Sequence, residues 1–165
     1  MNSIDQNSRT VLLEILKNEI ETASGGKALE YGSGRYSLAA ELRDRLDYLA
    51  CTDKSAEFTG SFRPEAEKKD IFLIPDEELG EDCYFGRFHL VYTVFGFRGQ
   101  PRLVDEVMKL RRLILKGGKI VIIDFAADNF DAECLKQLKR CGFADPHTRA
   151  LEIGGEAAFM IMAQK

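Results

Sequence analysis

The fold is decided by the stretch Ala28-Leu29-Glu30-Tyr31-Gly32-Ser33-Gly34-Arg35-Tyr36-Ser37, in which a short apolar strand ends in a carboxylate and meets a glycine turn. Gly32 and Gly34 allow bare backbone to approach a ligand, and the N–H groups that open the next helix point toward it. This pattern indicates a small-molecule site between a strand and a helix. The same kind of turn also occurs in proteins that bind no ligand, so a purely structural role stays open.

Helix and strand patterns alternate along the rest of the chain. Apolar residues at helical spacing predict an N-terminal helix within residues 1–24, which Ser24-Gly25-Gly26 ends. Runs of β-branched and aromatic residues predict strands at 27–31, 47–52, 70–74, 88–95, 119–124, 149–153 and 157–162. The helices predicted between them cover about 35–46, 101–117 and 135–143, and 55–62 is a short polar helix or a loop.

The order of these elements predicts how the strands pair. Strands that alternate with helices favour a parallel sheet with helices on both sides. The last two strands are joined only by a turn at Gly154-Gly155, whereas a parallel crossover needs about a dozen residues or more. One terminal strand should therefore run antiparallel to the rest of the sheet.

Length and composition favour one domain. The chain has 165 residues, of which 45% are hydrophobic, enough for one sizeable core and too few for two ordinary domains. We predict a single domain over 1–165, with an N-terminal helix in 1–24 and an α/β core in 27–165. The formal net charge of −4 gives no electrostatic signal for nonspecific nucleic-acid binding.

The cysteines and the apolar runs bear on the cellular compartment. The four cysteines form no C-x-x-C pair and are expected to be reduced thiols. The N-terminus has no basic-then-apolar signal pattern, and no apolar run approaches the roughly 18 residues of a membrane span. We therefore expect a soluble, cytoplasmic protein without a membrane partner.

Four motifs follow one another along the chain: Glu30-x-Gly32-x-Gly34 after the first strand, Asp53 after the second, Phe88-His89-Leu90-Val91-Tyr92 in the fourth, and Leu115 to Asp124 around the fifth. This ordered set resembles the class I S-adenosylmethionine-dependent methyltransferases over nearly the whole chain. The resemblance implies an α/β fold, a three-layer Rossmann-like sandwich whose mostly parallel seven-stranded sheet has an antiparallel C-terminal strand. It also implies methyl transfer with S-adenosylmethionine as the cofactor.

The resemblance implies a role for each matching position in the first half of the chain. Gly32, Ser33 and Gly34 would form the loop beneath the amino-acid end of the cofactor, and Glu30 would organise that loop or meet the cofactor's ammonium group. Asp53 would hold the two ribose hydroxyls, because a carboxylate at the tip of the neighbouring strand can accept two hydrogen bonds from a diol. The alternative for Asp53 is a helix cap or a surface residue.

Further positions would complete the cofactor site. Asp76, just beyond the third strand, would lie near the adenine amine, although it could equally be an ordinary loop residue. Thr93, Val94 and Phe95 would line the floor beneath the sulfonium methyl group, unless they are simply the packed end of a central strand. We predict no metal site.

Two side chains at predicted strand tips are candidates for a general base. Asp124 and Tyr92 could each accept a proton, which is needed only if the methyl acceptor arrives protonated. Asp124 could equally cap the segment that follows its strand. The acceptor itself has no signature in the sequence. The absence of a sizeable insertion suggests an open site, and therefore a large acceptor such as a protein, or a lid supplied by a partner subunit, with a homo-oligomer as one arrangement.

The departures from the family pattern keep two alternatives open. Arg35-Tyr36 stands where a third glycine commonly falls, and the bulky Tyr36 could narrow the cofactor pocket. A methyltransferase-like domain that has lost turnover and serves as a binding or regulatory partner is therefore the second hypothesis. The third is a nicotinamide-binding Rossmann protein, because Gly32-x-Gly34-x-x-Ser37 approximates that fingerprint. It ranks last because it explains neither Glu30 nor the antiparallel ending.

Overall fold

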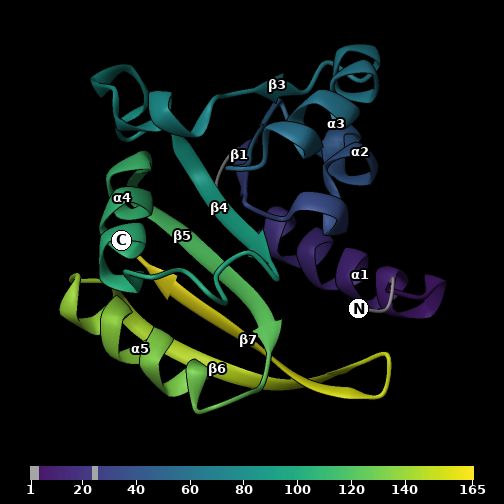
Figure 1. Cartoon of the computed structure of the whole chain (residues 1–165). Coiled ribbons are helices and arrows are strands. Elements are labelled where there is room, and N and C mark those ends of the chain that lie inside the picture. Colours follow the sequence, from purple (N-terminus) through teal and green to yellow (C-terminus); the bar gives the residue numbers. More distant parts are fainter. Residues whose placement is uncertain (1–3, 24–25) are drawn as a thin grey trace.

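A seven-stranded sheet forms the centre of the computed structural model, which describes residues 4–23 and 26–165 (Figure 1). Strands β1 to β5 run parallel to one another, whereas β7 runs antiparallel to both β5 and β6. This confirms the predicted mostly parallel sheet with an antiparallel C-terminal strand. The strands are Lys27–Tyr31 (β1), Tyr48–Thr52 (β2), Phe72–Leu73 (β3), Phe88–Val94 (β4), Ile114–Phe125 (β5), Ala144–Ile153 (β6) and Glu156–Gln164 (β7).

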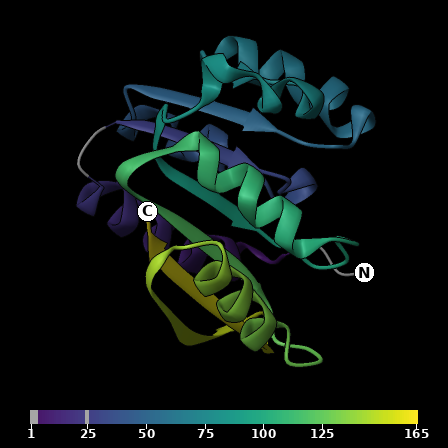
Figure 2. The ribbon, with the colours of Figure 1, turned by 90° about the vertical axis from the view of Figure 1, so that its left-hand side faces the viewer.

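Helices cover both faces of the sheet, which gives the three layers. Side chains of α1, α2 and α3 pack into the hydrophobic cluster on one face, and those of α4 and α5 into the cluster on the other. Figure 2 shows α4 and α5 lying across the face of the sheet that is turned toward the viewer. The helices are Gln6–Thr22 (α1), Ala39–Leu42 (α2), Ala56–Lys68 (α3), Leu103–Leu113 (α4) and Phe130–Arg140 (α5).

Local sequence explains the most regular elements. At the start of α1 the side chain of Asp5 accepts a hydrogen bond from the backbone N–H of Ser8 at 2.7 Å, which caps the helix. In β5 the four side chains from Ile120 to Ile123 have no exposed surface, because helices cover both faces of this strand. A continuous β-branched run is what such a doubly covered strand requires.

The continuous helix predicted over about 35–46 is wrong. The chain instead forms short helical turns at Gly34–Tyr36, in α2 and at Arg43–Arg45. Ser37 has φ −50° and ψ 134°, which is not helical, so the chain turns between the first two of these segments. The buried carboxylate of Glu30 accepts a hydrogen bond from Leu38 N just beyond this bend.

Other boundaries also differ from the sequence prediction. The segment after β2 continues as α3 to Lys68 although it contains Pro64. Helix α4 ends at Leu113, and Gly117-Gly118, predicted to end it, lie within β5, where the pairing with β4 shifts between Phe88 and Leu90. Gly117 has φ +82°, which this irregularity requires. The predicted helix stop at Ser24-Gly25 lies outside the described residues. Within the part of the chain that the structure describes, no helix has the length and apolar character to cross a membrane.

The strand order places a reversal point beside the glycine turn. The order is β3-β2-β1-β4-β5-β7-β6, so the chain builds outward from β1 in one direction and resumes on the other side with β4. In open α/β sheets, ligands bind outside the carboxyl ends of the strands at such a switch point. The fold therefore leads us to expect a ligand site near the carboxyl ends of the strands around the β1/β4 switch point.

Candidate functional site

The glycine turn is tied to the strands on both sides of it. Gly32 and Gly34 adopt φ values of +67° and +49°, in the left-handed region that favours glycine. The N–H of Gly32 donates to the carbonyl oxygen of Thr52 at 2.8 Å, and the hydroxyl of Ser33 accepts from the N–H of Val94 at 3.2 Å. The turn therefore bridges the ends of β1, β2 and β4.

Asp53 is oriented by the backbone at the tip of β2. One carboxylate oxygen accepts a hydrogen bond from Gly34 N at 2.9 Å, and the other accepts from Ser55 N at 2.7 Å. Each carboxylate oxygen has a second lone pair, so two further donors can still be accepted. The arrangement leaves Asp53 able to bind a diol.

A cavity of about 430 Å³ brings Asp53 and Asp76 together. It lies between the segment that follows β2 and the segment that follows β3, and its volume falls in the range of small-molecule pockets. The remaining lining residues are Lys54, Ala56, Thr59, Gly60, Arg63, Pro75 and Glu77. The two carboxylates that the sequence assigned to the adenosine part of a cofactor thus share one cavity. A second cavity, of about 300 Å³, includes Gly34 and Arg35 in its lining.

Glu30 faces the interior instead of either cavity. Its side chain is buried and accepts a hydrogen bond from Leu38 N at 2.9 Å. Burial raises the pKa of this carboxyl group above its ordinary value, while hydrogen bonds from Ser37 and Leu38 oppose the rise. In this arrangement Glu30 braces the chain that follows the glycine turn.

The end of β4 is packed closely against its neighbours. Thr93 is buried and its hydroxyl has no hydrogen-bond partner. Phe95 has φ +57°, an uncommon conformation for a bulky residue, and its ring stacks on Phe125 with centroids 4.2 Å apart. Tyr36 packs edge-on against the Phe95 ring at 5.2 Å. Thr93, Val94 and Phe95 line neither of the two cavities described above.

Gly96 lies close to the glycine turn and to Thr93 of β4. A Cβ atom at position 96 would lie 2.4 Å from the hydroxyl oxygen of Thr93 and 2.6 Å from the carbonyl oxygen of Gly32. The two glycine backbones therefore approach each other closely. The sequence analysis did not assign Gly96 a role, although a lone glycine at the end of a strand is a signal for such an approach.

The two candidate bases differ in what surrounds them. Asp124 is buried and accepts backbone hydrogen bonds from Phe125 and Arg98, so it anchors the loop after β4. Burial raises the pKa of Asp124, and these backbone N–H groups counteract the rise. Tyr92 is fully buried beside Glu30, and burial raises the pKa of its phenol well above the ordinary value. Tyr92 is therefore protonated at neutral pH, which does not suit a base.

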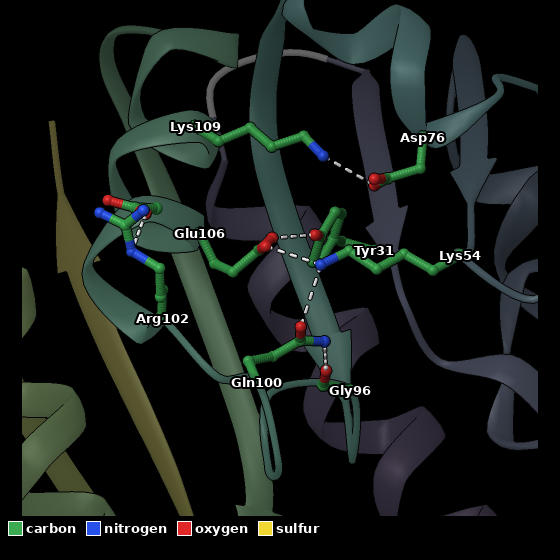
Figure 3. A network of polar contacts seen from close by, with 9 residues as sticks. Tyr31, Lys54, Asp76, Gly96, Gln100, Arg102, Glu106 and Lys109 are labelled. Carbon is green, nitrogen blue, oxygen red and sulfur yellow. Dashed lines mark hydrogen bonds and ion pairs between the residues drawn. The ribbon is translucent and has the colours of Figure 1, made fainter.

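A polar network crosses the β1/β4 switch point, and the sequence analysis missed it. The ammonium group of Lys54 contacts a carboxylate oxygen of Glu106 at 2.6 Å and the side-chain oxygen of Gln100 at 3.0 Å. Tyr31 donates its phenolic hydrogen bond to the other oxygen of Glu106. Figure 3 shows Glu106 on α4 reaching between Tyr31 and Lys54, with Lys109 pointing toward Asp76 further along the helix.

The ion pair between Lys109 and Asp76 is the second polar connection to α4. Its nitrogen and oxygen atoms are 2.7 Å apart, and the two side chains are 24% and 19% exposed. Asp76 thus has a protein partner already. Across residues 4–23 and 26–165, no group of three or more His, Cys, Asp or Glu side chains is arranged to hold a metal ion.

Solved structures share this fold. A SAM-dependent methyltransferase from Aquifex aeolicus matches with a TM-score of 0.73 at 16% identity, over 98% of each chain. The trans-methyltransferase CalH, in complex with SAH, matches with a TM-score of 0.71 at 16% identity, over 91% of this chain and 54% of CalH. The [4+2]-cyclase SpnF matches with a TM-score of 0.74 at 9% identity, over 92% of this chain and 81% of SpnF.

These comparisons establish the architecture. No protein-family model and no curated protein matches the chain. The chain has the class I S-adenosylmethionine-dependent methyltransferase fold, as its motifs predicted. Identities this low show the fold alone, and one fold can carry several chemistries.

Proposed function

We propose that this protein binds S-adenosylmethionine at the carboxyl edge of its sheet and transfers the methyl group to an acceptor. The observation that carries the proposal is the cavity shared by Asp53 and Asp76, next to a glycine turn whose Gly34 N–H orients Asp53. The cavity lies beyond the carboxyl ends of β2 and β3, on the edge of the sheet where α/β folds bind their ligands.

The residues present suit the adenosine part of the cofactor. Asp53 retains lone pairs for the two ribose hydroxyls, and Asp76, whose bond to Lys109 uses one carboxylate oxygen, retains the other for the adenine amine. When bound, the cofactor supplies an electrophilic sulfonium methyl group. The protein's contribution would be alignment and exclusion of water, which can be equivalent to roughly 7–11 kcal/mol in favourable cases.

A domain that binds the cofactor or a partner without turnover is the second candidate. The close contact between Gly96 and Gly32 favours it, because the space that the amino-acid end of the cofactor would need beside the glycine turn is narrow. The buried positions of Asp124 and Tyr92 favour it as well, since neither side chain presents an accessible base.

Titration with S-adenosylhomocysteine tests the binding site. Asp53→Ala should weaken the affinity by at least about tenfold, because hydrogen bonds to a charged group contribute roughly 1.5–3 kcal/mol. Asp82→Ala is the matched control, since Asp82 is an exposed carboxylate that does not line the cavity. Equal affinities of the two variants would remove Asp53 from the site.

Transfer of a labelled methyl group separates the two candidate functions. Wild-type protein incubated with methyl-labelled S-adenosylmethionine and a cell extract should label an acceptor, and Asp53→Ala should not. Binding without any incorporation would favour the domain that has lost turnover.

A further inference from the structure

We propose that Lys54, Glu106 and Gln100 form a latch that ties the loop after β4 and helix α4 to the wall of the cavity shared by Asp53 and Asp76, and that must open before a nucleoside cofactor can occupy this cavity. The proposal rests on the proposed function, because the cofactor in question is S-adenosylmethionine or its demethylated product. It adds that the protein has a closed conformation, in which these contacts are formed, and that this conformation excludes the ligand.

The latch joins two parts of the sheet that the fold keeps on opposite sides of the switch point. Lys54 directly follows Asp53 at the end of β2, whereas Gln100 and Glu106 belong to the loop after β4 and to α4. Lys54 Nζ lies 2.6 Å from Glu106 Oε1 and 3.0 Å from Gln100 Oε1. Gln100 is held in turn by its amide group, which donates to Gly96 O at 3.1 Å.

Glu106 is the pivot of the latch. Its side chain is 15% exposed, against 45% for Lys54, so Glu106 is the more buried partner of this ion pair. On its other side Glu106 accepts a hydrogen bond from the hydroxyl of Tyr31, which is buried. Burial opposes ionisation of Glu106, but the hydrogen bonds from Lys54 and Tyr31 outweigh it and lower the pKa of this carboxyl group. Glu106 is therefore charged at neutral pH, and the latch is closed.

The Lys109–Asp76 ion pair reinforces the closed state. Lys109 lies about one turn along α4 from Glu106, and its ammonium group is 2.7 Å from Asp76 and 5.5 Å from the centre of the Tyr31 ring. Two cations thus connect α4 to the ends of β2 and β3. Lys54 and Asp76 both line the cavity, so a nucleoside that enters it contacts one residue of each ion pair.

A closed latch lowers the apparent affinity for the cofactor. Only the open conformation can bind, so the measured dissociation constant rises in inverse proportion to the open fraction. Weakening the latch should therefore tighten binding, although the substitution removes a contact from the folded protein. Substitution of a residue that binds the ligand would have the opposite effect, because it would weaken binding.

The affinity for S-adenosylhomocysteine in latch variants tests the proposal. Glu106→Gln preserves the shape of the side chain and an acceptor for Tyr31 but removes the charge that holds Lys54. We expect its affinity for S-adenosylhomocysteine to exceed that of the wild type by at least about threefold, because the free energy of a partly exposed ion pair corresponds to a change of about this size. Asp105→Asn is the matched control, because Asp105 is the neighbouring carboxylate of α4 but does not line the cavity and pairs with Arg102 at 2.7 Å; Figure 3 shows Arg102 lying away from Lys54 and Tyr31.

Hydrogen exchange measured without ligand provides an independent readout. Backbone amides in residues 96–106 should exchange faster in Glu106→Gln than in Asp105→Asn. Lys54→Met removes both contacts of the latch and supplies the same comparisons if Glu106→Gln does not fold.

The outcomes separate the latch from the proposed function. Equal affinity of wild type, Glu106→Gln and Lys54→Met for S-adenosylhomocysteine would overturn the latch and leave the proposed function in place. Failure of all of these proteins to bind S-adenosylhomocysteine would overturn both.

Discussion

Gly96 is a residue with no room for a side chain. A Cβ atom there would meet a buried hydroxyl and the backbone of the glycine turn, at the distances given above. Gly96→Ala should therefore lower the free energy of unfolding by about 1–3 kcal/mol, the usual cost of forcing extra atoms into a packed region. Urea unfolding measures this directly.

Gly60 provides the control for that substitution. It lies within α3, and a Cβ atom there would meet nothing within 4 Å. Gly60→Ala should stabilise the protein by about 0.5–1 kcal/mol, because alanine is the better helix former. A loss of stability at position 60 as large as that at position 96 would show that the close approach of Gly96 and Gly32 is not the cause.

Glu30 should make the stability depend on pH. Burial raises its folded-state pKa above the ordinary value of 4.5, so the unfolded chain loses this proton first as the pH rises. Wild-type stability should then fall as the pH rises from 4.5 through the folded-state pKa. Glu30→Gln has no proton to lose, so it should gain stability relative to the wild type over this window.

Urea unfolding of both proteins at low and neutral pH checks this prediction. A difference in unfolding free energy between wild type and Glu30→Gln that does not change with pH would contradict it.

At the residue scale, local motifs predicted part of the candidate site. The glycine turn and Asp53 could be found because each directly follows a predicted strand, β1 for the turn and β2 for Asp53. The pair of Lys54 and Glu106 could not, because 52 positions separate these residues and only the folded chain brings them together. Nor does the sequence reveal that the carboxylate of Asp76 has a lysine partner in α4.

Helix α1 is joined to the central strand β5 by a polar contact. The ammonium group of Lys119 lies 2.6 Å from Glu19 and 2.6 Å from the hydroxyl of Thr22, and the Lys119 and Glu19 side chains are 14% and 17% exposed. Lys119→Met should lower the free energy of unfolding by about 1–2 kcal/mol, between the values for exposed and buried pairs.

The matched control for Lys119→Met is Lys136→Met. Lys136 pairs with Glu133 within α5 at 3.5 Å, and both side chains are well exposed. The control should unfold at the same urea concentration as the wild type. If both variants unfold at that concentration, the contact between α1 and β5 does not contribute to stability.

At the scale of elements, the sequence predicted strands better than helix ends. The run from Ile120 to Ile123 is recognisable because its composition reflects cover on both faces. The segment 35–46 has apolar residues at helical spacing, but the conformation of Ser37 and the contact between Glu30 and Leu38 divide it. Tertiary contacts of this kind override local propensity.

At the scale of the whole molecule, a mostly parallel sheet carries a cavity of about 430 Å³ at the carboxyl ends of β2 and β3. The mostly parallel sheet was predictable from the alternation of elements, and the antiparallel ending from the short connection between the last two strands, whereas the order of the strands was not predicted. The backbone contact at Gly96 and the contact between Lys54 and Glu106 of α4 were not predictable, because strand patterns do not encode them. The match to a [4+2]-cyclase shows that the fold alone does not decide the reaction.

Calorimetric titration of the wild-type protein with S-adenosylhomocysteine, with NAD as the comparison ligand, tests the central claim most directly. The account predicts saturable binding of one S-adenosylhomocysteine per chain and no binding of NAD, with a matching rise in thermal stability for the sulfur nucleotide alone. Binding of NAD, or of neither ligand at high concentration, would contradict an S-adenosylmethionine site at the carboxyl edge of the sheet.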